Sequence, residues 1–134
     1  MGAMETEMSK GEYAITLDTE NNIVHVVARG ELDKKLGEEI ITKTRLMAAD
    51  LQYPILCDVS GAEVKVSFTD WFFLPRTLPI FKDIKIRIIK VALLISPGNQ
   101  EGEYSFYETV ARNEGMFLKL FSMEKEAVEW LKES

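Results

Sequence analysis

The sequence predicts an α/β fold: one domain with a five-stranded, mostly parallel sheet, an opening hairpin and four helices. Short strand-like apolar runs alternate with segments of helical periodicity along the chain. The run at 86–95 is apolar on both faces, as central parallel strands are. Two strand-like segments near the start are separated only by a polar turn, which is typical of a hairpin.

The first predicted elements are this hairpin and a long helix. Alternation over 13–18, a polar turn at 19–22 and an apolar run at 23–28 predict the hairpin. Helical spacing then extends from Asp33, the expected N-cap, to about Leu51. The expected apolar face comprises Leu36, Ile40, Ile41, Met47, Ala48 and Leu51, and the expected polar face Lys34, Lys35, Glu38, Glu39, Lys43 and Arg45.

The middle of the chain predicts two strands separated by a helix. Pro54 leads into a short buried strand that ends in a tight turn at 58–61. A second helix begins near Thr69, where Pro75 is compatible only with the first turn and Pro79 ends or kinks the helix. The next strand lies within 86–95 and ends at the turn 96–99.

The last part of the chain predicts a helix, a strand and a closing helix. The third helix spans 103–113, and Gly115 ends it. Residues 116–121 form the last strand, and Ser122 is the expected N-cap of the closing helix. The core side of that helix comprises Ala127, Val128, Trp130 and Leu131.

Size and composition indicate one globular domain. The chain has 134 residues, of which 46% are hydrophobic and 28% charged. A chain of this length buries about 70% of its unfolded surface, so it needs no metal or disulfide to fold. The net charge of −6 argues against a nucleic-acid partner, because phosphate binding requires a basic patch.

The cysteine content and the amino terminus favour a cytoplasmic protein. Cys57 is the single cysteine and lies in an apolar run, which predicts an inert thiol and no disulfide. No membrane span is expected, because no run approaches about 18 apolar residues. Residues 1–10 are interpreted as a tag scar and disordered leader, and 11–134 as the domain.

Enzymatic constellations are absent from the sequence. His25 is the only histidine and lies in the middle of an apolar strand, where a structural role is expected. Neither the spacing of the carboxylates nor Cys57 supports a catalytic triad or a metal site around it. Glycine-rich phosphate loops are missing as well. We therefore expect no enzymatic activity, no metal and no cofactor.

Asp58 and Ser60 form the most informative local motif, directly after the apolar run 55–57. Ligands of α/β proteins bind at the carboxyl ends of strands, which makes this motif a candidate site. An aspartate and a serine two residues apart also commonly bond the backbone of their own turn. We favour this structural interpretation.

The chain resembles the SpoIIAA-like branch of the STAS superfamily in four features. These are the order of elements, the Asp-x-Ser-Gly motif at 58–61, the run 89–94 and the ending 121–131. The resemblance spans Tyr13 to Leu131 and implies a non-enzymatic regulatory domain. In the best understood members, an anti-anti-sigma switch is controlled by phosphorylation of a serine at the start of the second helix. Those members carry Asp-Ser-Ser-Gly there, whereas this chain has Val-Ser-Phe-Thr-Asp at 66–70.

The resemblance adds a second set of candidate residues. Ser67 and Thr69 carry hydroxyl groups near the expected start of the second helix. Either residue could be a phosphorylation site or an N-cap of the helix, and we favour the N-cap. The resemblance also places the turn 58–61 beside the turn 96–99. A polar crevice rimmed by Ser60, Ser67, Ser96, Asn99 and Gln100 would then accept an anion or a side chain of a partner.

The segment 71–81 is unusually rich in apolar residues. One helix face can bury Trp71, Leu74 and Leu78 on the sheet. The remaining apolar side chains, Phe72, Phe73, Ile80 and Phe81, cannot all lie on that face. Three explanations compete: a thick local core, an interface with a partner or a second copy, and the wall of a ligand pocket.

Two functions follow from these observations. The first is a regulatory or protein-interaction module, acting on a protein partner or as a homodimer through the aromatic segment. The alternative is a small carrier domain that binds an apolar or amphipathic ligand between the sheet and the second and third predicted helices. Its cavity would be lined by Trp71, Phe73, Leu78 and by Tyr104 or Tyr107.

Overall fold

The structure is a computed structural model that describes residues 11–98 and 100–133, except for the side chains of Phe68 and Phe72. The predicted leader at 1–10, Asn99 and Ser134 lie outside the described residues. The strands are β1 (Glu12–Asp18), β2 (Ile23–Asp33), β3 (Ile55–Lys65), β4 (Val91–Leu94) and β5 (Leu118–Phe121). They form one sheet in the order β1-β2-β3-β4-β5. Only the β1–β2 pair is antiparallel, which confirms the predicted hairpin and mostly parallel sheet.

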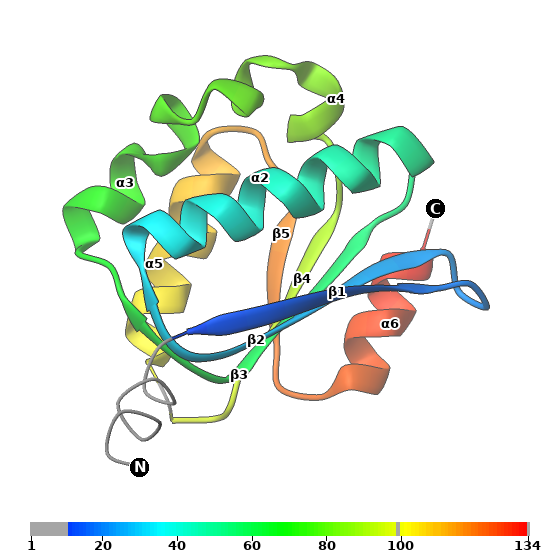
Figure 1. Cartoon of the computed structure of the whole chain (residues 1–134), viewed down its shortest axis with the longest axis horizontal. Helices are drawn as coiled ribbons and strands as arrows, with labels where there is room; N and C mark the ends of the chain where they lie inside the picture. The colour runs from blue at the N-terminus through cyan, green and yellow to red at the C-terminus, as the bar shows by residue number, and fades with distance from the viewer. Residues whose placement is uncertain (1–10, 99, 134) are drawn as a thin grey trace, which may run out of the picture.

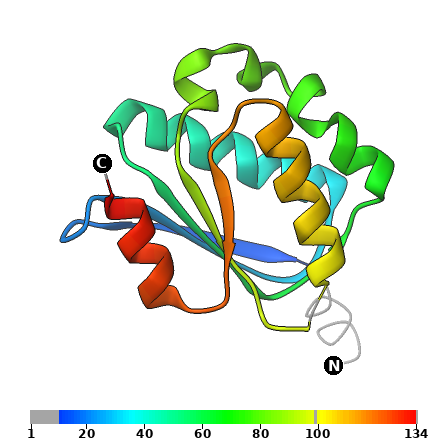
Figure 2. The ribbon, with the colours of Figure 1, turned by 180° about the vertical axis from the view of Figure 1, so that it is seen from behind.

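Helices cover the two faces of this sheet unequally. The α-helices are α2 (Lys34–Leu51), α3 (Phe68–Thr77), α4 (Ile84–Arg87), α5 (Glu101–Asn113) and α6 (Glu124–Lys132), with a 3₁₀ turn, η1 (Pro79–Lys82). Figure 1 shows α2, α3, α4 and α5 on one side of the sheet and α6 on the other. Seen from behind, α5 and α6 lie on opposite sides of β5 (Figure 2). The described helices exceed the predicted four because α4 forms within an apolar stretch that the sequence assigned partly to a strand.

The alternation of side chains along the central strands builds two cores. Val24 and Val26 of β2 point to the face that carries α2 and α5, and they belong to the larger cluster. Ile23 of the same strand belongs to the smaller cluster beneath α6, with Leu56 of β3. All four residues of β4 are buried, as predicted for a strand covered on both faces.

Helix α2 begins as predicted but presents a different face to the core. The Asp33 side chain accepts a hydrogen bond from the backbone N–H of Leu36 at 2.8 Å, which makes it the N-cap. The predictions that Met47 and Leu51 are core residues and that Arg45 lies on the polar face are wrong: the first two are exposed and Arg45 is 3% exposed. The reason is tertiary, because the segment carrying η1 and α4 packs beside Arg45.

The predicted turn at 58–61 is also wrong, because β3 continues through it to Lys65. Val27 pairs with Asp58 and Arg29 pairs with Gly61, so two residues of β3 lie opposite one residue of β2. This arrangement is a β-bulge. The Asp58 carboxylate bonds the backbone N–H of Ser60, which bends the strand locally without ending it.

Prolines and caps account for the other differences. Pro75 lies well past the first turn of α3, contrary to prediction, and its ring is fully buried. The free energy gained by burying the ring offsets the loss of the helical hydrogen bond that proline cannot donate. Pro79 follows the end of α3 and opens η1, as predicted. Ser122 is not the N-cap of α6: Met123 occupies that position and makes no side-chain cap bond.

Candidate functional site

The structure brings the polar motif of β3 and the turn after β4 together. Asp58 Oδ1 accepts hydrogen bonds from the Ser60 backbone N–H at 2.9 Å and from Ser60 Oγ at 2.6 Å. Ser96 Oγ donates to the Ser60 carbonyl at 2.9 Å. The two segments therefore meet, although Asn99 lies outside the described residues. These side chains already bond partners within the protein, which supports the structural interpretation of the motif.

Gln100 binds the backbone at the same end of β3. Its Oε1 accepts from the Val64 backbone N–H at 2.7 Å, and its Nε2 donates to the Val64 carbonyl at 2.8 Å. The side chain thus serves the backbone at the end of β3 in the way that a neighbouring strand would. The amide is occupied by Val64 and is not presented to an anion.

Ser67 has the capping role that we favoured. Its Oγ accepts a hydrogen bond from the Asp70 backbone N–H at 3.1 Å. Asp70 is 3.7 Å from Lys34 Nζ, and Thr69 is exposed. A phosphate on Ser67 would lie beside the Asp70 carboxylate, which opposes its charge. Phosphorylation of Ser67 or Thr69 remains a prediction.

The aromatic segment divides between core and surface. Trp71 and Phe81 are buried, Leu78 is half-buried, and Phe73 is 47% exposed. The Phe72 side chain lies outside the described part of the structure. The rings of Trp71 and Tyr107 lie 4.4 Å apart, centroid to centroid, so α3 packs on α5 through aromatic contact.

A cavity that is partly open to solvent, here called the internal cavity, lies between this aromatic contact, α2 and the sheet. Its larger part, the inner hollow, has a volume of about 80 Å³, and its lining includes Gly37, Cys57, Trp71, Tyr104 and Tyr107. A side hollow of about 50 Å³ adjoins it, lined in part by Thr44 and Arg45. The two hollows share Ile40, Ile41, Cys57, Leu93 and Tyr107. The predicted lining residues Trp71, Tyr104 and Tyr107 contribute to the inner hollow, whereas Phe73 and Leu78 do not.

Three polar atoms on the side chains that line this cavity have no hydrogen-bond partner in the described part of the chain. They are Trp71 Nε1, Tyr104 OH and Thr44 Oγ1. His25 Nε2 is a fourth such atom, on a strand residue outside these linings. Each unsatisfied buried group costs about 1–3 kcal/mol. Three of the four atoms therefore belong to residues that line one cavity.

Arg45 is a buried charged residue that the sequence analysis placed on the polar face of its helix. Its Nη1 donates to the Ile86 carbonyl at 3.2 Å, and its guanidinium lies 4.9 Å from the centre of the Phe81 ring. Burial lowers its pKa, and the neighbouring Tyr107 hydroxyl, to which it is hydrogen-bonded, opposes that shift. The spacing of Arg45 from Ile41 and Ala48 places it on the buried stripe of α2 and was the available signal.

Cys57 lies where the two hollows meet, and burial raises the pKa of its thiol to about 12. The thiol is therefore neutral near pH 7 and a poor nucleophile. In an unfolded chain this group ionises near its ordinary pKa of 9.0. Folding consequently favours the protonated thiol, and this contribution to stability is complete below pH 9 and is lost between pH 9 and about 12.

The free energy of unfolding is expected to fall as the pH rises above about 9, with Cys57 contributing up to about 1.4 kcal/mol per pH unit. Urea titrations of the wild type and Cys57→Ala at about pH 7, 9 and 11 measure this effect. Tyr104 and Tyr107 also have raised pKa values from burial, so both proteins should weaken, the alanine variant less steeply. Parallel pH profiles would contradict the assignment to the thiol.

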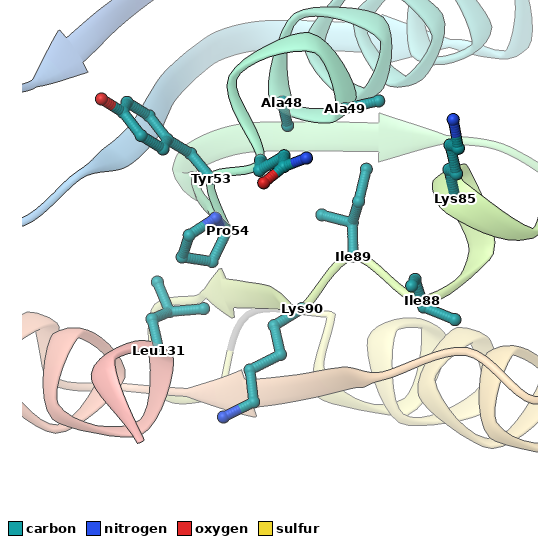
Figure 3. A pocket seen from close by; sticks show the side chains of 10 residues that line it. Ala48, Ala49, Tyr53, Pro54, Lys85, Ile88, Ile89, Lys90 and Leu131 are labelled. Carbon is teal, nitrogen blue, oxygen red and sulfur yellow. The ribbon is translucent and has the colours of Figure 1, made fainter. Parts of the chain in front are cut away.

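A larger hollow, the outer groove, opens at the other end of the sheet. It has a volume of about 470 Å³ and lies between the end of α2, α4 and the end of α6. Figure 3 shows Ile88, Ile89, Lys85, Lys90 and Leu131 around it. Lys90 Nζ donates to the carbonyls of Trp130 and Glu133, so its charge caps α6. The groove therefore exceeds the internal cavity in size but does not have its set of unsatisfied polar atoms.

Two other kinds of site are not found in the described residues. No group of three or more histidine, cysteine, aspartate or glutamate side chains is arranged there to hold a metal ion. None of the helices in that part of the chain combines the length and the apolar character needed to cross a bilayer.

Comparison with known proteins identifies the fold. No family model matches the sequence, and no curated protein matches it. The structure is similar to that of an uncharacterized protein of the DUF3478 family with a SpoIIAA-like fold from Shewanella loihica PV-4. The match covers 90% of this chain and 93% of that chain, with a TM-score of 0.55 and 16% sequence identity. The chain therefore has a SpoIIAA-like fold, as its sequence resemblance predicted; at this identity, the similarity does not extend to function.

Proposed function

We propose that this domain is a non-enzymatic binding module that holds a small apolar or amphipathic molecule in the internal cavity. The observation that carries the proposal is the set of three unsatisfied polar atoms, Trp71 Nε1, Tyr104 OH and Thr44 Oγ1, around a space lined mainly by aliphatic and aromatic side chains. Ligand sites typically combine an apolar lining with a few polar groups of this kind. A bound molecule would fill the apolar space beside these groups.

The size of the cavity limits the ligand. The inner and side hollows have volumes of about 80 and 50 Å³. A cavity of roughly 150 Å³ in another protein accommodates benzene. Both hollows together are smaller than that, so the ligand in the described conformation is at most a short branched chain, and an aromatic ring would require the cavity to widen. Longer molecules would require α3 to move away from α5.

Gly37 provides a way to block the cavity without removing any of its side chains. It belongs to α2 and lines the inner hollow, and a Cβ atom added there meets no heavy atom within 4 Å. Gly37→Leu should place a side chain over the mouth of the hollow and stabilise the helix by about 1 kcal/mol. Gly102→Leu is the matched control, because Gly102 is an exposed helical glycine with equally open surroundings.

Native mass spectrometry tests the proposal. We expect the wild type and Gly102→Leu to carry a mass adduct that denaturation removes, and Gly37→Leu to lack it. Bare protein in all three spectra would contradict a retained ligand. An adduct that Gly37→Leu keeps would place the ligand elsewhere, with the outer groove as the next site to test.

A protein-interaction module is the second candidate, as the resemblance to anti-sigma antagonists suggests. Exposed apolar side chains favour it: Phe73 on α3 is 47% exposed, and Ile84 and Ile88 at the two ends of α4 are 65% and 53% exposed. The same spectra separate the two candidates, because a dimer without added mass would support an interface between copies. A protein partner, a homodimer, a cytoplasmic location and the absence of a nucleic-acid partner remain predictions.

A further inference from the structure

The outer groove is large enough for a small molecule, and much of its lining is apolar. Its volume of about 470 Å³ lies within the range of about 300–1,000 Å³ that is usual for ligand sites. Pro54, Ile89 and Leu131 lie around it together with Ala48 of α2 (Figure 3). Ile88 lines the same groove, and its side chain is 53% exposed. The groove therefore leaves apolar surface in contact with water.

The described charged residues that line the groove, Lys85 and Lys90, are both lysines. Lys90 Nζ donates to the carbonyls of Trp130 and Glu133, so its charge is directed to the end of α6. Lys85 takes part in none of the ion pairs found among the described residues. The Asp83 carboxylate accepts a hydrogen bond from the Lys85 backbone N–H at 2.9 Å and caps α4. Within that part of the chain, Lys85 therefore brings an unpaired positive charge to the groove.

The helix ends at the groove do not outweigh this charge. Helices α2 and α6 both end beside it, and the carboxyl end of a helix carries a partial negative charge. At α2, the backbone N–H of Gln52 bonds the carbonyls of Ala48 and Ala49. At α6, Lys90 bonds carbonyls of the last turn and of the C-cap. The full charge of Lys85 therefore exceeds the partial charges of carbonyls that are already paired.

We infer that the outer groove binds an amphipathic anion, namely a medium-chain aliphatic carboxylic acid. Figure 3 shows Lys85 and Leu131 on opposite sides of the groove, with Ile88 and Ile89 between them. The carboxylate pairs with Lys85, and the aliphatic chain covers the two isoleucines toward Leu131. This inference goes beyond the proposed function, because none of the described residues that line the groove lines the internal cavity.

An ordinary surface role for Lys85 makes a different prediction. Lysine side chains are mostly exposed, and single apolar side chains such as Ile88 are normal on a protein surface. In that case, removal of the Lys85 charge would not change the affinity of the groove for any small molecule. Selectivity between head groups is therefore the measurement that separates the two roles.

Octanoate and octanol are suitable probes, because they share the aliphatic chain and differ in the charge of the head group. In an NMR titration of the isotopically labelled full chain, both should shift the amide signals of Ala49, Ile88 and Ile89. Octanoate should bind about fivefold more tightly, as expected for one exposed ion pair. Lys85→Met should remove this preference and keep the binding of octanol. High salt should reduce the preference of the wild type, because salt screens exposed charges.

Lys82→Met is the matched control, because Lys82 is an exposed lysine of η1 that borders a different hollow. It should keep the preference for octanoate. An equal loss of preference in Lys82→Met and Lys85→Met would show that the overall charge of this region attracts the anion, against pairing with Lys85. Ile88→Ser should weaken both probes, whereas Gly37→Leu, which changes the internal cavity, should leave both affinities unchanged.

The possible results separate this inference from the proposed function. Equal affinity of the two probes at the groove would overturn the assignment of an anion. Signal shifts confined to the internal cavity and abolished by Gly37→Leu would overturn the groove as the site and support the proposed function. No shift with either probe would overturn the inference, and the mass adduct would still decide the proposed function.

Discussion

Replacement of Trp71 with alanine is expected to lower the free energy of unfolding by about 3–5 kcal/mol. The side chain is 7% exposed and packs on Tyr107 with ring centroids 4.4 Å apart. It also lines the inner hollow, so its removal would enlarge an existing cavity that the surrounding helices cannot easily close. Equilibrium unfolding in urea, monitored by circular dichroism, gives the value.

Two further variants make this measurement specific. Trp71→Phe keeps an aromatic ring and removes the unpartnered Nε1 group, so it should cost much less than alanine. Phe73→Ala changes an aromatic residue on the same helix whose side chain is 47% exposed, and it should stay within about 0.5 kcal/mol of the wild type. Equal losses for Trp71→Ala and Phe73→Ala would show that α3 does not pack as described.

Replacement of Leu131 with alanine is expected to cost about 2–5 kcal/mol. Leu131 is buried in the smaller core together with Leu56 and Ala127. Within the described residues, α6 is the helix on that side of the sheet, so no second helix there can compensate for its loosening. Hydrogen exchange should rise first in α6 and at Ala92 and Leu94 of β4, while α2 stays protected.

Leu46→Ala is the control for that prediction. Leu46 also lies in a helix but is exposed, and its truncation should change the free energy of unfolding by no more than about 0.5 kcal/mol. A loss at Leu131 as small as that at Leu46 would contradict the docking of α6 on the central strands.

The sequence predicted the architecture well because periodicity reports which side of an element is buried. The hairpin, the long helix capped by Asp33 and the doubly buried β4 all follow from local spacing. The ending 121–131 indicated both the closing helix and the fold. In each of these regions, local propensity and tertiary packing favour the same structure.

The departures occur where tertiary contacts decide the outcome. Arg45 was assigned to solvent because of its charge, but a carbonyl and an aromatic ring from η1 and α4 receive it. Ile86 and Arg87 belong to the stretch 86–95 that suggested a strand, yet they form the end of a short helix capped by Asp83. The partner of Arg45 lies about 40 residues further along the chain. The short helix depends on tertiary packing, which the spacing of apolar residues alone does not encode.

The candidate site was predictable only in part, for a related reason. The predicted cavity residues were Trp71, Phe73, Leu78 and Tyr104 or Tyr107, because related folds open a pocket between a helix and the sheet. Of these, Trp71, Tyr104 and Tyr107 line the inner hollow, and Phe73 and Leu78 do not. The unsatisfied state of Trp71 Nε1 and Tyr104 OH could not be predicted, since it depends on which atoms lie nearby in the folded chain. Residue type reveals a donor, but only the structure reveals that the donor lacks an acceptor.

The bulge in β3 makes the strand one residue longer than its partner requires. Ile55, Cys57 and Val59 face the larger core, and after the bulge Ala62 and Val64 face it too, so the extra residue shifts the alternation by one step. Removing Ser60 would give an uninterrupted two-residue repeat with the same apolar residues pointing inward. A residue can therefore be lost at this position while the following side chains keep the same faces of the sheet. This makes the bulge a point where the length of a buried strand can vary.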